Sequence, residues 1–153
     1  LSWITILRKR ENFRRAFHDF DTARIARYGA KDIARLMSDA GIVRNKLKIE
    51  STIDNAKAFQ ALSKRTHFAH FVWSFIPDTP IQNNVTSFKD IQSQTEISKS
   101  LSTALKKEGF RFVGATTVYA FMQSSGMVND HLVSCPRHKA CAKLQLKLKV
   151  PGR

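Results

Sequence analysis

DAGIVRNKLK, residues 39–48, is the stretch that decides the fold of this chain. A single glycine in it, Gly41, marks a tight turn. Apolar residues recur with the period of a helix on both sides of that turn, which predicts helices at about 31–38 and 45–64. The stretch therefore predicts two helices joined by a short hairpin centred on Gly41.

The basic residues after the turn indicate what such a hairpin would bind. A glycine lets the backbone approach a ligand closely, and the start of the second helix directs N–H groups and the positive end of its dipole at an anion. This favours a hairpin that grips the phosphates of one DNA strand, with Gly41, Arg44 and Lys48 as DNA-binding residues. The alternative is an ordinary packed corner between two helices.

Helical periodicity continues over most of the chain and predicts an all-α fold. Further helices are expected over 1–20, 21–28, 68–75 (capped by Thr66), 98–109 and 116–125. Residues 76–96, with Pro77 and Pro80, predict a loop. Residues 143–150, KLQLKLKV, alternate like a strand but have no obvious partner, which favours a frayed tail. We therefore expect a helical domain over 1–138 and a basic tail over 139–153.

The charge balance points to the class of partner. The 153 residues include 26 lysines and arginines against 12 acidic residues, a formal net charge of +14. Such an excess favours a polyanion, nucleic acid before a membrane surface, because neutralised phosphates release counterions. The alternative is a basic protein whose charge serves only solubility.

Other global features narrow the setting. No apolar run approaches the roughly 20 residues of a membrane-spanning helix, and no signal-peptide pattern opens the chain. Two cysteines, Cys135 and Cys141, form no disulfide framework and predict a reducing compartment. The chain begins at Leu1, in the middle of an apolar pattern, so we expect that a preceding segment is not included.

His131 and Cys135 lie four positions apart, a spacing that suits two ligands of one metal ion. A closed structural zinc site needs four ligands. His138 and Cys141 offer a local completion, although Pro136 and the close spacing oppose such a wrap. The alternative is a histidine and a small cysteine that bind no metal.

The two tryptophans differ in their surroundings. Trp73 has several aromatic neighbours in sequence and is expected in the core. Trp3, on the first helix, is either another core residue or a ring that stacks on an extruded, cationic base. Neither Asp39 nor Asp130 forms a carboxylate pair of the kind that acid–base hydrolysis uses. The residues alone thus indicate DNA binding and half a metal site, with no visible catalyst.

Five segments carry a family resemblance: LSWITILRKRENFRRAF from residue 1, DAGIVRNKLKIESTIDNAKAF from 39, FVWSF from 71, LSTALKKEGFRFVG from 101 and YAFMQSSGMVNDH from 119. In this order they closely resemble the DNA-3-methyladenine glycosylase I (Tag) family over residues 1–138. The resemblance implies an all-α helix-hairpin-helix DNA glycosylase fold. It also implies a monofunctional glycosidase of base excision repair, which hydrolyses the N-glycosidic bond of 3-methyladenine in alkylated DNA.

The same resemblance assigns roles to residues. His131 and Cys135 match the C-terminal pair of a structural zinc site whose other cysteine and histidine precede Leu1. The catalytic carboxylate and a pocket tyrosine are likewise expected upstream of Leu1, so no catalytic residue falls within this chain. Trp3 matches the base-contacting tryptophan, and Leu1 lies near the flipped nucleotide.

The implied partner is double-stranded DNA containing 3-methyladenine, bound by a monomer in the bacterial cytoplasm and associated with the nucleoid through DNA. Because the pocket is incomplete, we expect the 153-residue chain itself to be inactive. Two alternatives stay open: a non-catalytic helix-hairpin-helix DNA-binding fragment, and a scaffold with a self-contained zinc site.

Overall fold

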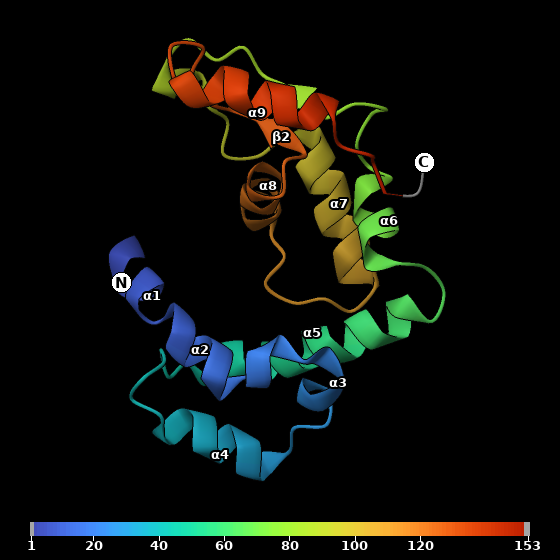
Figure 1. The fold of residues 1–153 in the computed structure, drawn as a ribbon. Helices are drawn as coiled ribbons and strands as arrows, with labels where there is room; N and C mark the ends of the chain where they lie inside the picture. The colour runs from blue at the N-terminus through green and yellow to red at the C-terminus, as the bar shows by residue number, and fades with distance from the viewer. Residues whose placement is uncertain (1, 152–153) are drawn as a thin grey trace. The chain divides into compact units, whose positions relative to one another are not determined.

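The structure, a computed structural model, describes residues 2–151 and is predominantly helical (Figure 1). The chain divides into two compact units. The first contains the residues up to Arg65 together with Glu108–Phe112, and the second contains Thr66–Lys107 and the residues from Val113 onward. The expected all-α class is confirmed.

The first unit is built from short helices around one long helix. In chain order these are α1 (Trp3–Arg8), α2 (Arg10–Ala16), the 3-10 turn η1 (His18–Phe20), α3 (Thr22–Ile25), α4 (Ala30–Ser38) and α5 (Lys46–Ser63). Their apolar faces enclose a core that includes Phe17, Ile25, Leu36, Ile49 and Ile53. The helices predicted on either side of Gly41 are both present, and residues 39–45 connect them.

The continuous helix expected over residues 1–20 is wrong. It breaks at Lys9, whose backbone N–H bonds to the carbonyls of Ile6 and Leu7 and so closes α1. A second change of direction follows at His18–Phe20, where three successive residues have φ of 51°, 54° and 60°. This left-handed turn costs on the order of 1–2 kcal/mol per residue.

Aromatic packing accounts for that turn. The turn places the ring of Phe20 parallel to the ring of the buried Phe17, with centroids 5.8 Å apart. Phe17 also stacks on Tyr28, at 6.4 Å. The Asp21 side chain then accepts hydrogen bonds from the first amides of α3, as its sequence position predicted.

The second unit combines helices with one short strand pair. Its elements are α6 (Phe68–Trp73), β1 (Ile81–Gln82), η2 (Phe88–Asp90), α7 (Glu96–Lys107), α8 (Ala115–Ser124), β2 (Val128–Asn129) and α9 (Pro136–Leu146). β1 and β2 pair in parallel, Ile81 opposite Val128 and Gln82 opposite Asn129. Trp73 is 7% exposed, so its predicted place in the core is confirmed.

Three local predictions in this unit need correction. The predicted loop 76–96 contributes β1 and η2. His67 rather than Thr66 precedes α6, and it makes no side-chain cap hydrogen bond. Helix α7 begins at Glu96, because Thr95 and Ser98 cap it reciprocally through Thr95 N to Ser98 Oγ (2.8 Å) and Ser98 N to Thr95 Oγ1 (3.2 Å).

The frayed tail expected over residues 143–150 is also wrong as far as residue 146. Helix α9 opens with Pro136 at its first position, where a missing N–H costs nothing. The buried Gln145 holds the helix by donating from Nε2 to the carbonyl of Gly126 at 2.8 Å. The alternating leucines misled the prediction, since Leu144 and Leu146 are 64% and 83% exposed.

Over residues 2–151, no helix has the length and apolar character needed to cross a membrane.

Candidate functional site

Trp3 lies on the surface of the first unit. Its side chain is 84% exposed, and α1 buries none of its residues. The helix begins at Ser2, whose Oγ accepts from the amide of Thr5 at 3.3 Å. Because most of its surface is exposed, the interpretation of Trp3 as a core residue is wrong.

Trp3 borders an open pocket of about 480 Å³ formed by α1, α2, η1 and the start of α5. Its walls are mainly apolar and aromatic: Trp3, Ile6, Phe13, Phe17, Phe20, Val43 and Ile49. Ser2, Lys48 and Thr52 supply the polar edge. Among the described residues that line it there is no carboxylate, so the walls present can stack on a flat ring but offer it no anionic group.

The 39–45 connection has a tightly held backbone. Asp39 Oδ1 accepts from the Gly41 amide at 2.7 Å, and Asn45 Oδ1 accepts from the Lys48 amide at 3.0 Å, which caps α5. A Cβ on Gly41 would lie 2.9 Å from Asp39 Oδ1 and 3.3 Å from Asn12 Nδ2. A side chain at position 41 would therefore require the ends of the Asp39 and Asn12 side chains to move.

Arg44 and Lys48, the predicted phosphate contacts, are both exposed. Lys48 belongs to the first turn of α5 and also lines the pocket beside Trp3. The structure thus brings together, within one unit, the Gly41 turn, an exposed cation and the exposed indole. An arrangement of this kind can place positive charge along the phosphates of a DNA strand while the ring faces a base.

His131 and Cys135 are adjacent in the second unit. Cys135 Sγ lies 3.9 Å from His131 Nδ1. Two tetrahedral zinc ligands, a nitrogen at roughly 2.0–2.1 Å and a sulfur at about 2.3 Å, are about 3.6 Å apart. The pair therefore fits one zinc ion after a small closing movement.

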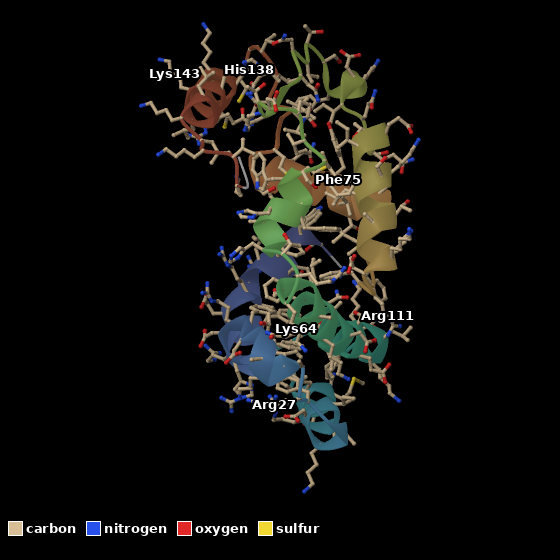
Figure 2. The ribbon with its side chains drawn as sticks, turned by 90° about the vertical axis from the view of Figure 1, so that its right-hand side faces the viewer. Arg27, Lys64, Phe75, Arg111, His138 and Lys143 are labelled. Atoms are coloured by element: carbon tan, nitrogen blue, oxygen red, sulfur yellow. The ribbon has the colours of Figure 1, made fainter. Side chains whose placement is uncertain are left out.

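The local four-ligand site is not formed. Across residues 2–151, no three histidine, cysteine, aspartate or glutamate side chains gather in a way that could hold a metal ion. His138 lies on the inner side of α9, away from the exposed Lys143 (Figure 2), and its Nε2 is buried without a hydrogen-bond partner among the described residues. Cys141 lines a separate pocket with Asn129 and His131.

Asn129 is a site residue that sequence reasoning missed. Its side chain is 2% exposed and makes three hydrogen bonds. Nδ2 donates to Gln82 Oε1 (2.9 Å) and to the carbonyl of His138 (3.0 Å), while Oδ1 accepts from the amide of His131 (3.3 Å). Asn129 thereby ties β1, the His131 segment and α9 together. An asparagine between valine and aspartate carried no sequence signal of burial.

Asp130 is the centre of a neighbouring network. It accepts from Asn83 Nδ2 at 2.7 Å and from Gln123 Nε2 at 2.6 Å, and Asn83 Nδ2 also reaches the Tyr119 hydroxyl at 3.3 Å. Burial, followed by the nearby Asp130 carboxylate, raises the pKa of Tyr119 well above its usual value. Asp130 is thus engaged in holding α8 to the β1 segment.

Known proteins share the sequence pattern of this chain over most of its length. The family model described as methyladenine glycosylase matches residues 1–138. The chain belongs to the methyladenine glycosylase family. The resemblance inferred from its sequence segments, and the residue at which that resemblance ends, are both confirmed.

Individual relatives of this methyladenine glycosylase-family chain support the same family assignment. It is 50% identical over 137 residues to "DNA-3-methyladenine glycosylase" of Haemophilus influenzae (strain ATCC 51907 / DSM 11121 / KW20 / Rd), covering 89% of this chain and 74% of the relative. It is 47% identical over 136 residues to "DNA-3-methyladenine glycosylase 1" of Escherichia coli (strain K12), covering 88% and 73%.

Solved structures give the same result. A crystal structure of 3-methyladenine DNA glycosylase I superposes with a TM-score of 0.85 at 47% identity, covering 89% of this chain and 75% of that one. The Staphylococcus aureus 3-methyladenine DNA glycosylase I, described for its recognition of 3-methyladenine, superposes at 0.83 with 34% identity, covering 89% and 73%. The chain therefore spans about three quarters of the length of its relatives.

Proposed function

We propose that this chain functions in a DNA-3-methyladenine glycosylase. This monofunctional enzyme hydrolyses the N-glycosidic bond of 3-methyladenine in alkylated DNA. Family membership over residues 1–138 supports the activity. The observation that carries its assignment to this surface is the 84% exposed Trp3 at the mouth of an aromatic pocket. Methylation at N3 makes the base cationic, and a cation over an indole face gains a cation–π interaction.

The 39–45 connection is proposed as the hairpin of a helix-hairpin-helix element that holds double-stranded DNA. The N-terminal end of α5 carries the exposed Lys48, with Arg44 just before it. A positive helix end and two cations favour phosphate oxygens. Phosphate contacts position the duplex without reading its sequence, as a repair enzyme requires.

The zinc site is proposed as a structural one. His131 and Cys135 supply two ligands, and the family resemblance places a cysteine and a histidine of the N-terminal segment as the other two. Zinc with four protein ligands has no open position for substrate and acts as a cross-link. The chemistry of base release needs no metal here, because the cationic base is already a good leaving group.

The chain's own pocket supports a second candidate function. Since no carboxylate is found among the described lining residues, residues 1–153 alone are proposed to bind DNA and to release little base. Loss of one pre-positioned electrostatic group commonly costs about a hundredfold or more in rate. In that form the chain is a non-catalytic DNA-binding fragment.

Release of 3-methyladenine from methylated duplex DNA tests these proposals. The 153-residue chain is compared with a chimera carrying the N-terminal segment of the Haemophilus influenzae relative ahead of Leu1. We expect duplex binding by both and base release at least about a hundredfold faster from the chimera. Equal rates would place a catalytic group within residues 1–153, and no release from a folded chimera would contradict the glycosylase assignment.

The oligomeric state and the cellular location are also proposed. We expect a monomer that works on DNA in the bacterial cytoplasm and nucleoid, in keeping with two cysteines, a +14 charge and bacterial relatives. Sedimentation with and without a short duplex measures the stoichiometry.

A further inference from the structure

The side chain of Lys9 reaches the 39–45 connection from the junction of α1 and α2. Its Nζ donates to the carbonyl oxygen of Ala40 at 2.9 Å and to that of Gly41 at 3.0 Å. Lys9 is half-buried, so its ammonium is partly withdrawn from water. Charge-assisted hydrogen bonds of this kind are roughly twice as strong as neutral ones. One side chain therefore holds two successive carbonyls of the connection.

Asn12 of α2 reinforces this clamp. Its Nδ2 donates to the same Gly41 carbonyl at 3.1 Å. Arg15 donates to Asn12 Oδ1, which fixes the orientation of the amide so that Nδ2 faces Gly41. The closeness of Asn12 to Gly41, where a Cβ would lie 3.3 Å from Nδ2, shows how tightly the connection is fitted against α2.

Helix α1 depends on the same junction for its position. None of its residues is buried, so core packing contributes little to its position. Lys9 closes α1 with its backbone N–H and starts α2 by accepting from the amide of Phe13 at 2.9 Å. Trp3 is six residues from Lys9, which is fewer than two helical turns. Whatever fixes Lys9 therefore also fixes the direction in which α1 carries the indole.

We infer that Lys9 is a positioning residue that couples the DNA-binding connection to the helix carrying Trp3. The inference rests on the proposed function of both elements. A duplex bound at Arg44 and Lys48 also contacts the segment held by Lys9. Phosphate binding and the position of the indole are therefore coupled. Lys9 acts through Ala40 and Gly41 and makes no contact with the base.

The test in the free protein uses Lys9→Met, which keeps the length of the side chain and removes its donors. Arg10→Met, at the exposed neighbouring position, is the matched control for loss of one charge. We expect hydrogen exchange of the Gly41 and Ile42 amides to accelerate about tenfold in Lys9→Met, to stay unchanged in Arg10→Met and to return close to the original rate in Lys9→Arg. Unchanged exchange in Lys9→Met would overturn the clamp.

Coupling to α1 is measured by fluorine NMR of protein labelled with 5-fluorotryptophan. The buried Trp73 serves as an internal reference for the exposed Trp3. In Lys9→Met we expect the Trp3 signal to shift and the Trp73 signal to stay in place, which also shows that the chain remains folded. A Trp3 signal that does not move, while Gly41 exchange accelerates, would overturn the coupling.

Binding experiments separate this inference from the proposed function. Lys9→Met should lower the preference for an alkylated over an undamaged duplex, and adding it to Trp3→Ala should cause no further loss of that preference. A fall of about 1 in the slope of log affinity against log salt, beyond that of Arg10→Met, would identify Lys9 as a direct phosphate contact and overturn the positioning role. If Arg44 and Lys48 prove irrelevant to binding, the proposed DNA-binding role of the 39–45 connection fails while the exchange result stands.

Discussion

Trp3 is a large apolar residue that the folded chain leaves exposed. Its ring is almost fully in water, beside an aromatic pocket and on a helix that buries nothing. A residue of this kind contributes little to this folded state, and an exposed aromatic ring beside a pocket is typical of a binding surface.

Trp3→Ala is expected to change the free energy of unfolding by less than about 0.5 kcal/mol, as surface substitutions usually do. The same change should abolish the preference for alkylated over undamaged duplex, because the stacking surface is gone. Trp73→Ala, in the core, is the contrast and should cost about 3–5 kcal/mol. Urea unfolding and duplex competition measure both effects. A strongly destabilised Trp3→Ala would return the indole to a structural role.

Asn129→Ala removes a buried amide with three partners. We expect a loss of about 2–3 kcal/mol in the free energy of unfolding, because the Gln82 side chain and two backbone groups lose their bonds to it. Asn84→Ala, at an exposed position nearby in sequence, is the control and should be close to neutral. Equal stability of the two variants, measured by urea unfolding, would show that Asn129 does not hold β2 and α9 together.

At the scale of elements, the α4–connection–α5 unit has a local explanation for each of its parts. Asp39 holds the Gly41 amide, Asn45 caps α5, and the long helix buries Ile49 and Ile53 in the core. The basic residues are left outside because burial of an unpaired charge is costly. The segment is thus ordered before any DNA arrives.

Arg44→Ala combined with Lys48→Ala should weaken binding to every duplex, damaged or not. If each contacts one phosphate, the slope of log affinity against log salt should fall by about 1.8. Arg27→Ala with Lys31→Ala removes two exposed charges of the same unit near the other end of α4 and is the matched control (Arg27 is labelled in Figure 2). Fluorescence anisotropy over a salt series distinguishes them, and identical slopes for the two double variants would reject the hairpin assignment.

At the scale of the whole molecule, the proposed zinc site would join segments far apart in the family's chain. His131 and Cys135 lie close together, with 3.9 Å between Nδ1 and Sγ, and Asn129 accepts from the His131 amide, but the pair would supply only two ligands. Zinc bound by two ligands is held far more weakly than zinc bound by four.

We therefore expect no tightly bound zinc on residues 1–153 after dialysis, and one zinc per chain on the chimera with the family's N-terminal segment. His131→Ala in the chimera should remove it. Elemental analysis after gel filtration is the measurement. One stoichiometric zinc on the 153-residue chain would instead favour a local site that includes His138 or Cys141.

Much of this protein could be predicted from its sequence, because the determining interactions are local. Helices α4 and α5 follow from apolar periodicity, the turn between them from Gly41, and the start of α3 from Asp21. Net charge indicated a polyanionic partner, and the order of short segments indicated the family. Each of these depends on residues near one another in the chain or on composition.

Other features depended on contacts that only tertiary structure forms. At the break after α1, the Lys9 side chain bonds to the 39–45 connection, and next to the left-handed turn at His18–Phe20 the ring of Phe17 enters the core. Helix α9, over Pro136–Leu146, is held in place because the Gln145 side chain donates to the carbonyl of Gly126, nineteen residues earlier. Trp3 and Trp73 are the same residue type, yet one lies in water and the other in the core. Periodicity cannot separate them, because burial is decided by which distant segments pack over a side chain.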